Sequence, residues 1–504
     1  MAESTRADVC LLLEGTYPYV PGGVSSWVHA LLEALPQRRF SLLHIAPHPG
    51  AYTELRYPIP DNVVGLEQVY CHATPGQPRR GPPPRPGGRR SHPDRRPRVL
   101  RALERMHLGE PIDDQLIADL AAGDLSVGDF LHGPDAFDLI RDVLYPALAP
   151  EAPFTEFFWH TRAMHVPLLR LLAETAPAAE VYHSASCGYA GLVATVASAR
   201  TGRPMIITEH GLYAREREME LSRATWIQDL GVGEGGGGDI ELSPLRGMWS
   251  SFFGTLSRIA YHHASDLLTL SEVNRRKQIE DGAPPDKLTI IPNGVEPERY
   301  ADIAERRLAV APAARVLRAG FVGRVVPIKD VLTLIRAISL AQQQVDVELW
   351  IVGPEDESPE YAAKCHALVD QLRLGQRVSF LGRRDVREIY AEVDVLVLTS
   401  LSEGQPLVIL EAHAAGVPVI ASDVGACREL LEGRDRVDAA LGPSGIVTRV
   451  ANPADTAAAL VAMAREPQRR VAMGRAGLAR VREHYRQTDV ITRYDQVYGA
   501  MLGA

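Results

Sequence analysis

Short apolar segments alternate with amphipathic ones along the whole chain, which is the pattern of parallel strands connected by helices. Residues 9–13 form the first apolar run, and a loop rich in proline and glycine follows them. Between residues 24 and 35 the apolar positions recur at steps of three and four, so they lie on one face of a predicted helix. A strand, a glycine loop and a helix in this order are typical of the opening unit of a nucleotide-binding sheet.

The same alternation continues to the end of the chain and predicts an α/β protein. Because strands separated by helices of this length return through right-handed crossovers, we expect parallel sheets. Residues 99–180 are expected to be mainly helical. The further predicted strands cover residues 42–46, 180–183, 204–209, 267–270 and 288–291, and then residues 315–322, 346–352, 378–381, 393–398 and 417–422.

The expected domain boundary lies at residues 296–314, which are charged, rich in alanine and interrupted by prolines. We therefore expect a first domain of residues 1–300, a second of residues 301–485 and a helical segment of residues 486–504, with inserts near residues 72–135 and 229–240.

Two segments of unusual composition lie in the first domain. Residues 79–98 hold eight arginines and one acid, which fits a solvated loop or a docking site for anionic lipid or another anionic partner. Six of the eight residues 231–238 are glycine, which fits a linker or an active-site lid.

Composition narrows the class of protein. A chain of 504 residues exceeds one ordinary core, which supports two domains, and a formal net charge of −9 gives no electrostatic reason to expect nucleic acid as a partner. The five cysteines have neither a C-x-x-C nor a metal-ligand spacing, so a reducing compartment fits them best. We see no secretory signal pattern and no apolar run long enough to cross a bilayer. A cytoplasmic protein is therefore expected.

Two cations, Arg324 and Lys329, follow the first predicted strand of the second domain, in the segment GRVVPIK of residues 323–329. Loops at the carboxyl ends of parallel strands line the ligand crevice of such sheets. A diphosphate leaving group gathers negative charge as a glycosidic bond breaks, and a guanidinium and an ammonium aimed at it stabilise that charge. Taken alone, the same two residues also fit an ordinary solvated strand end.

Two carboxylates, Glu403 and Glu411, lie eight residues apart where a strand ends and a helix begins. If Glu403 stands at the helix entrance, the two lie on nearly one helical face, and each can hold a different hydroxylated part of one ligand. The free amides of the predicted helix N-terminus favour phosphate oxygens. The alternative is one acid that complements the helix dipole and a second, solvated acid. The expected ligand contacts in this segment are Gly404, Gln405, Pro406 and Leu407.

Together these two motifs resemble the retaining GT-B glycosyltransferases of group 1, which have two facing Rossmann-like domains with parallel sheets and a cleft between them. The resemblance implies a nucleotide-sugar donor, with UDP as the expected nucleotide, and neither a cofactor nor a metal. It implies that Arg324 and Lys329 hold the donor diphosphate. It also implies that Glu403 contacts the donor sugar and that Glu411 contacts the ribose.

Two further segments match the same group. Gly22 and Gly23, in the loop after the first strand, are implied to face the donor phosphates across the cleft. Asn293 belongs to the segment IPNGV of residues 291–295, which resembles the hinge-proximal segment of the group. Glu296 stands where an aspartate is more usual.

Three segments more closely resemble the glycosyltransferases of the Pel exopolysaccharide type: LEGTYPY at residues 13–19, TEHGLY at residues 208–213 and SEGQP at residues 402–406. This resemblance implies a cytosolic enzyme that adds sugars to a growing bacterial exopolysaccharide. The implied partners are the nucleotide-sugar donor, a polysaccharide acceptor and inner-membrane proteins of polysaccharide synthesis and export. A peripheral place at the inner membrane follows from them.

His210 follows a predicted strand, at a carboxyl edge where a ligand would lie. A lone histidine there is more often structural, but Tyr213, Arg215 and Arg217 gather at the same edge and favour a ligand site. Glu14, at another strand end, is a weaker candidate of the same kind. In the resembled enzymes a histidine at this place lies near the donor sugar and the reacting carbon. The expected catalytic residues are thus His210, Arg324, Lys329 and Glu403.

The implied reaction retains the anomeric configuration. The acceptor hydroxyl attacks from the face that the nucleoside diphosphate leaves, and a donor phosphate oxygen takes the proton. The sequence contains no G-x-S-x-G, H-E-x-x-H or D-x-D motif, so we expect neither a serine nucleophile nor a metal. Two alternatives stay open: a nucleotide-sugar epimerase of the same fold, and a non-catalytic nucleotide-sugar-binding scaffold of an export complex. A dinucleotide oxidoreductase is disfavoured, because the first loop lacks G-x-G-x-x-G.

Overall fold

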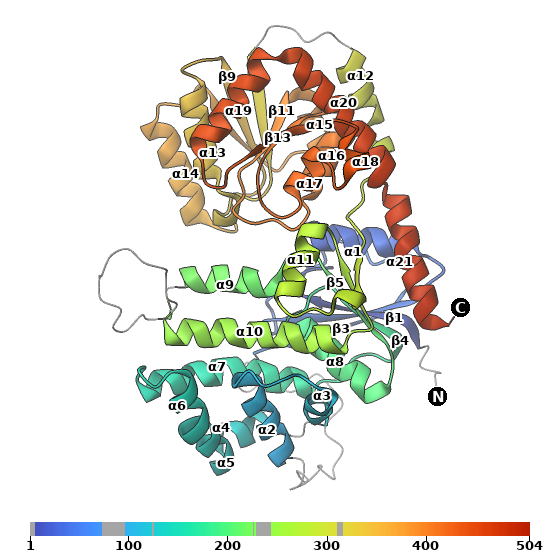
Figure 1. Ribbon diagram of the computed structural model, residues 1–504, viewed down its shortest axis with the longest axis vertical. Helices are drawn as coiled ribbons and strands as arrows, with labels where there is room; N and C mark the ends of the chain where they lie inside the picture. The colour runs from blue at the N-terminus through green and yellow to red at the C-terminus, as the bar shows by residue number, and fades with distance from the viewer. Residues whose placement is uncertain are drawn as a thin grey trace. The chain divides into compact units, whose positions relative to one another are not determined.

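The computed structural model of the protein describes residues 6–72, 96–122, 125–224, 226–227, 243–309 and 316–503. The chain forms two compact units, each built around one sheet (Figure 1). Unit 1 comprises Met1–Thr269, Arg276–Thr289 and Asp495–Ala504, and unit 2 comprises Leu270–Arg275 and Ile290–Tyr494. Residues 79–95 of the arginine-rich stretch, the glycine run at residues 231–238 and residues 310–314 of the expected boundary lie outside the described residues.

A seven-stranded sheet lies at the core of unit 1, in the order β3-β2-β1-β4-β5-β6-β7. The pairings among β1 to β6 are parallel, and Leu11 of β1 lies opposite Leu42 on one side and His183 on the other. β1 and β2 are buried almost throughout, which is why most of their residues are apolar. The strands are β1 (Ala7–Glu14), β2 (Phe40–Ala46), β3 (Val63–Tyr70), β4 (Ala179–Ser184), β5 (Met205–Glu209), β6 (Asp266–Thr269) and β7 (Leu288–Ile290).

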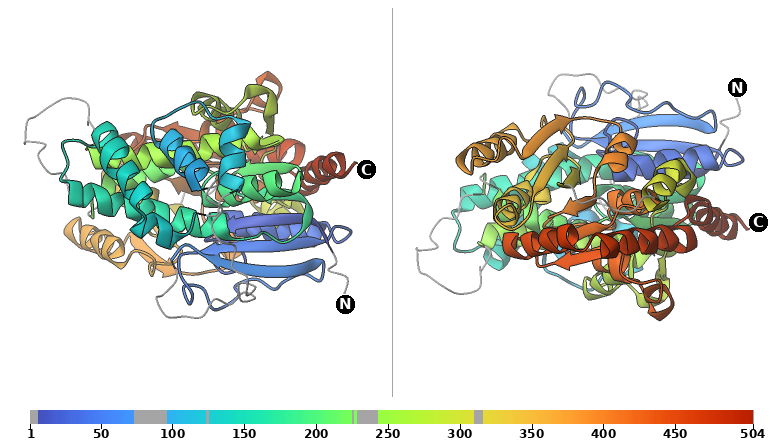
Figure 2. Two further views of the ribbon diagram at one scale, coloured as in Figure 1. Left: turned by 90° about the horizontal axis from the view of Figure 1, so that it is seen from below. Right: turned by 90° about the horizontal axis from the view of Figure 1, so that it is seen from above.

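The helices of unit 1 include the group that was expected between residues 99 and 180. Figure 2 shows this group, coloured cyan to teal, gathered on one side of the blue N-terminal strands. It consists of α2 (Arg96–His107), α3 (Asp114–Ala121), α4 (Val127–His132), α5 (Pro134–Asp138), the π-helix η1 (Leu139–Leu144), α6 (Tyr145–Leu148) and α7 (Phe154–Ala173). The other helices are α1 (Gly23–Ala34), α8 (Tyr189–Thr201), α9 (Tyr213–Arg223), α10 (Pro244–His263) and α11 (Glu272–Glu280), whose last residues belong to this unit.

Unit 2 holds a six-stranded parallel sheet in the order β10-β9-β8-β11-β12-β13. Its strands are β8 (Leu317–Val322), β9 (Val347–Val352), β10 (Val378–Gly382), β11 (Val395–Leu398), β12 (Val419–Ser422) and β13 (Gly445–Thr448). Its helical segments are η3 (Pro297–Tyr300), α12 (Ala301–Ala309), η4 (Pro327–Lys329), α13 (Val331–Ala341), α14 (Pro359–Gln371), α15 (Val386–Glu392), α16 (Leu407–Ala414), α17 (Cys427–Glu432), α18 (Arg436–Ala439), α19 (Pro453–Arg465), α20 (Pro467–His484) and the start of α21 (Gln487–Leu502).

The direction of strand addition reverses once in each sheet, between β1 and β4 in unit 1 and between β8 and β11 in unit 2. In open parallel sheets, ligands bind beyond the carboxyl ends of the strands at such a reversal. The α/β class with two parallel sheets is confirmed, and every strand predicted from the apolar runs is present. None of the helices that the structure describes has the length and apolar character of a membrane span.

Candidate functional site

The strongest pairing among the predicted site residues joins Lys329 to Glu403, both in unit 2. Lys329 ends the short helical turn η4 after β8, and Glu403 lies in the loop after β11. The Nζ atom of Lys329 donates a hydrogen bond of 2.5 Å to Oε1 of Glu403, and the two side chains are 19% and 10% exposed. Ser400 donates a second hydrogen bond of 2.6 Å to the same oxygen. A charge-assisted pair is thus largely shielded from solvent at the strand-order reversal.

Backbone contacts fix the two loops that carry this pair. The amide of Leu401 donates to the carbonyl of Ile328 over 2.8 Å. The hydroxyl of Thr399 donates to the carbonyl of Asp330 over 3.0 Å. Because β8 and β11 are neighbours, their following loops run side by side and hold each other. The positions of Lys329 and Glu403 are therefore set by the sheet.

Arg324 has a different acidic partner. Its Nη1 atom lies 2.5 and 2.7 Å from the two carboxylate oxygens of Glu357, in the loop after β9, and its side chain is 46% exposed. An ion pair this exposed contributes little to stability, since water screens both charges. Arg324 is therefore a solvent-accessible cation in the loop that also leads to Lys329. That both cations hold a diphosphate stays a prediction.

The expected helix-face relation between Glu403 and Glu411 is wrong. α16 begins at Leu407 with Pro406 as its N-cap, so Glu403 lies in the preceding loop. The physical reason is Pro406, because a residue that precedes proline is disfavoured in the helical conformation. Glu411 does lie on α16, where its Oε2 accepts a hydrogen bond of 3.1 Å from the hydroxyl of Tyr390. Burial raises the pKa of Glu411, and the side chain is half-buried, so it is not a fully solvated acid.

Gln405 and Asn293 are in direct contact and both are buried. The amide N–H of Asn293 donates to Oε1 of Gln405 over 2.6 Å, and Nε2 of Gln405 donates to the carbonyl of Leu270 over 3.2 Å. Nδ2 of Asn293 returns a hydrogen bond of 3.0 Å to the carbonyl of Gln405. Both ends of the Gln405 amide are thus engaged by backbone, which holds three chain segments of unit 2 together. Its role as a donor contact stays a prediction, as do those of Gly404 and Leu407.

Gly425 is a site residue that sequence reasoning missed. It lies after β12 with φ of +51°, and a Cβ on it would come within 2.0 Å of the carbonyl oxygen of Glu403. The next amide, of Ala426, donates to the carbonyl of Gly404 over 2.8 Å. Glycine is needed here because both the backbone conformation and the close approach exclude a side chain. The available signal was a glycine three residues after a predicted strand.

In unit 1, His210 directly follows β5 and packs against Trp27 of α1, with ring centroids 4.4 Å apart. Burial lowers the pKa of His210 to about 3, so the imidazole is neutral at physiological pH. Among the described residues, its Nε2 atom is buried without a hydrogen-bond partner. Gly22 is the N-cap of α1 and Gly23 is the first residue of that helix. The glycine loop and His210 are therefore connected through Trp27.

The other polar residues at this edge are used within unit 1. Arg215 forms ion pairs with Glu280 and Asp281 at 2.9 and 3.0 Å. Arg217 lies over the ring of Tyr213, 5.4 Å from its centroid. These contacts favour a structural role for Arg215. Arg217, with its side chain 35% exposed, stays available to solvent.

Two further features bear on ligands. Within the described ranges, no group of three or more His, Cys, Asp or Glu residues is placed to hold a metal ion.

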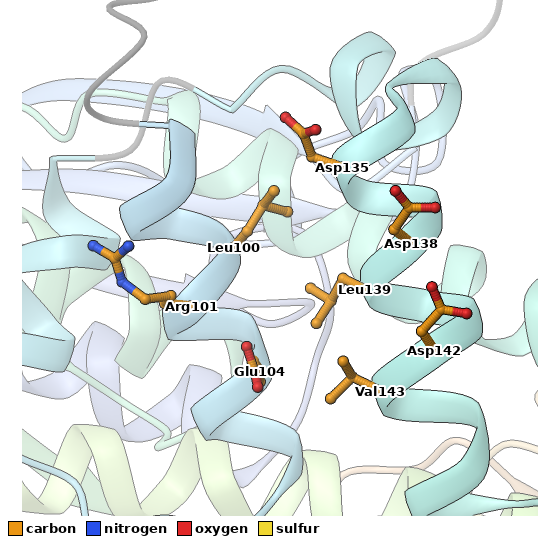
Figure 3. Close-up of a pocket in the computed structure, with 8 residues that line it drawn as sticks. All are labelled: Leu100, Arg101, Glu104, Asp135, Asp138, Leu139, Asp142 and Val143. Atoms are coloured by element: carbon orange, nitrogen blue, oxygen red, sulfur yellow. The ribbon is translucent and has the colours of Figure 1, made fainter.

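A groove runs between α2 and the segment formed by α5 and η1, with apolar side chains pointing between the helices and carboxylates around them (Figure 3). None of the predicted site residues lines it. The lining residues are Leu100, Arg101, Glu104, Asp135, Asp138, Leu139, Asp142 and Val143.

Two family models match the chain. One, described as "Domain of unknown function (DUF3492)", matches residues 7–286, which is more than half of the chain. The other, described as "Glycosyl transferases group 1", matches residues 317–466, which include β8, β11 and the pair of Lys329 and Glu403. The chain belongs to the DUF3492 family, and its residues 317–466 match the group 1 glycosyltransferase model. The group 1 match thus lies within the unit that holds the charged pair.

Two curated relatives and one solved structure are similar to the chain. The MMP alpha-(1->4)-mannosyltransferase of Mycolicibacterium hassiacum is 27% identical over 311 residues, 60% of this chain and 65% of that protein. The D-inositol 3-phosphate glycosyltransferase of Stackebrandtia nassauensis is 32% identical over 209 residues, 39% of this chain and 45% of that protein. Both alignments thus span less than two thirds of the relative's own length. Anabaena HepE, solved in complex with UDP, has a TM-score of 0.59 at 16% identity and covers 98% of this chain and 100% of its own. That likeness shows the GT-B fold.

Proposed function

We propose that this group 1 glycosyltransferase moves a sugar from a nucleoside diphosphate sugar, with UDP as the nucleotide, to a growing bacterial exopolysaccharide of the Pel type. The observation that carries the proposal is the pair of Lys329 and Glu403 at the strand-order reversal of unit 2. A cation and a carboxylate held side by side offer one group to a diphosphate and the other to sugar hydroxyls. The UDP bound by the structural neighbour HepE supports the choice of nucleotide.

The chemistry follows from the hydrogen-bonding capacity of each group. The ammonium of Lys329 has three donors, so it can stay on Glu403 and still reach phosphate oxygens. Described side chains donate to Glu403 only through Oε1, so its Oε2 can accept from a hydroxyl of the donor sugar. Arg324 adds a second cation, since its exposed pair with Glu357 is readily exchanged. Together the two cations stabilise the charge that grows on the leaving diphosphate.

In this proposal Glu411 acts as a hydrogen-bond acceptor, and His210 acts as a neutral hydrogen-bonding group. Glu411 is oriented by Tyr390 and accepts from the ribose hydroxyls of the nucleotide. Because the pKa of His210 is about 3, this residue acts as a neutral hydrogen-bonding group on the transferred sugar and does not donate a proton. A donor phosphate oxygen takes the proton of the acceptor hydroxyl, and the anomeric configuration is retained.

The proposed partners are the polysaccharide acceptor and the inner-membrane proteins of polysaccharide synthesis and export, with the enzyme in the cytoplasm and peripheral at that membrane. The test is a panel of nucleotide sugars assayed for release of nucleoside diphosphate, with and without membrane fractions that supply acceptor. Release of UDP from one UDP-sugar, increased by acceptor, is the expected result. Conversion of the sugar without release of UDP would instead indicate an epimerase. Binding without any turnover would indicate a scaffold.

A further inference from the structure

Glu209 is a buried carboxylate at the end of β5, next to His210, and only 2% of it is exposed. Its Oε1 accepts from the backbone amide of Tyr213 over 2.9 Å and from the thiol of Cys187 over 3.0 Å. Its Oε2 accepts from the hydroxyl of Tyr261 over 2.6 Å and from Nε2 of Gln278 over 2.5 Å. A carboxylate is tolerated at such a buried position only because hydrogen bonds replace its hydration.

The four donors come from four different segments of unit 1. Tyr213 is the first residue of α9, and Cys187 lies in the loop between β4 and α8. Tyr261 is on α10 and Gln278 is on α11. The Glu209 side chain thus connects these four segments to the carboxyl end of β5, next to His210.

The hydrogen bond from the amide of Tyr213 to the Glu209 carboxylate joins the two ends of the turn that contains His210. The turn of His210, Gly211 and Leu212 starts at the backbone of Glu209 and ends at the amide that the Glu209 carboxylate holds. The turn is also tightly packed, since a Cβ on Gly211 would lie 2.0 Å from a carboxylate oxygen of Glu216. Its geometry therefore depends on how far the Glu209 side chain reaches.

Few other contacts hold the imidazole of His210 in position. Its Nε2 atom lacks a hydrogen-bond partner among the described residues, and the ring of Trp27 contacts one side. Burial lowers the pKa of His210 to about 3. Glu209 therefore acts on His210 through the turn that its hydrogen bond with the amide of Tyr213 holds.

We propose that Glu209 is the positioning residue that sets the place of the His210 imidazole. The inference rests on the proposed function, in which His210 acts on the transferred sugar. It predicts that side-chain length matters more than charge at position 209. Glu209→Asp keeps the charge but withdraws the carboxylate by about 1.5 Å, one carbon–carbon bond. Glu209→Gln keeps the length and an acceptor for Tyr213.

The glutamine variant can also satisfy its surroundings. Its amide NH₂ would face the hydroxyl of Tyr261, which can rotate to accept, and the amide of Gln278, which can turn its oxygen inward. The Oε1 side keeps its two donors. Glu209→Gln should therefore fold, whereas a change to alanine would leave four donors unpaired.

The experiment measures kcat and KM for the UDP-sugar, and the Kd of UDP, in Glu209→Gln, Glu209→Asp, His210→Ala and the double variant Glu209→Asp with His210→Ala. Glu209→Gln should keep kcat within about threefold of wild type, and Glu209→Asp should lower it by at least about tenfold, since a misplacement of about 1 Å can reduce rates a hundredfold. The Kd of UDP should change by less than about twofold in both. Glu220→Asp, on the exposed face of α9, is the matched control and should behave as wild type.

The decisive comparison is the double variant. If Glu209 acts through His210, adding Glu209→Asp to His210→Ala causes no further loss of kcat. Additive losses, a wild-type rate in His210→Ala, or a folded Glu209→Gln protein that loses as much kcat as Glu209→Asp would each overturn the inference. If thermal melting shows that Glu209→Asp does not fold, a folded Glu209→Gln protein that loses kcat by about tenfold or more still overturns the inference. A wild-type enzyme that releases no nucleoside diphosphate from any donor would instead overturn the proposed function, and the inference with it.

Discussion

Lys329 and Glu403 are separated by 74 positions in the chain, yet Nζ of the lysine lies 2.5 Å from Oε1 of the glutamate. The reason is the strand order, because β8 and β11 are adjacent and each residue follows one of them. The pair lies where the direction of strand addition reverses, which is the general ligand-binding place of open parallel sheets. The proposed donor chemistry depends on both members of this pair.

Lys329→Ala should lower kcat/KM for the UDP-sugar by at least about tenfold, equivalent to about 1.4 kcal/mol of transition-state stabilisation. The variant loses the ammonium that faces the leaving diphosphate and leaves Glu403 without its cation. Steady-state kinetics measures the effect, and circular dichroism checks the fold. Lys364→Ala, on the exposed face of α14, is the control and should retain full activity. Near-normal turnover in Lys329→Ala would remove the donor assignment.

Gly425→Ala should destabilise unit 2 and impair turnover. A Cβ would press on the carbonyl oxygen of Glu403, and the φ of +51° is unfavourable for alanine. We expect the free energy of unfolding to fall by about 2 kcal/mol, within the range for a strained backbone residue. Urea denaturation measures the loss. Gly375→Ala, where a Cβ meets no atom within 4 Å, should leave both stability and activity unchanged. Equal behaviour of the two variants would refute the close approach.

The strands could be predicted from sequence because most of them are continuous apolar runs, but β3 and β13 could not. Both are edge strands, at the end of the seven-stranded and the six-stranded sheet. β3 has a mixed pattern, with Glu67 and Gln68 inside it, and β13 has only four residues. An edge strand is covered on fewer sides, so its sequence needs fewer apolar positions.

The site was predictable only in part, for a similar reason. Arg324, Lys329 and Glu403 stand at strand ends, which local sequence reveals. The direct contact of Lys329 with Glu403 depends on the non-local order of β8 and β11, which local patterns do not specify. The hydrogen bonds of Glu209 likewise come from four segments far apart in the chain.

Gln405→Ala should reduce stability more than nucleotide affinity. It leaves the amide of Asn293 and the carbonyl of Leu270 without their buried partner. We expect about 2 kcal/mol less unfolding free energy from urea denaturation, and a Kd of UDP within about threefold of wild type by calorimetry. Gln371→Ala, at the exposed end of α14, should change neither quantity. Lost UDP binding at unchanged stability would show that Gln405 is a donor contact instead.

Acid sensitivity of the fold should report on the lowered pKa of His210. The unfolded chain binds a proton on this histidine near pH 6.5, whereas the folded protein does so only near pH 3. Between these values the unfolded state holds more protons, so stability falls as the pH is lowered. His210→Gln should therefore lose less melting temperature than wild type between pH 7 and pH 5. The exposed His132→Gln should lose as much as wild type. An equal loss in all three proteins would contradict the burial of His210.

The most direct test of the central claim is a crystal structure of the protein with UDP. The account predicts that the diphosphate oxygens lie within hydrogen-bond distance of Nζ of Lys329 and the guanidinium of Arg324, with the ribose hydroxyls on Glu411. A nucleotide bound elsewhere on the protein, with these two cations uninvolved, would contradict it.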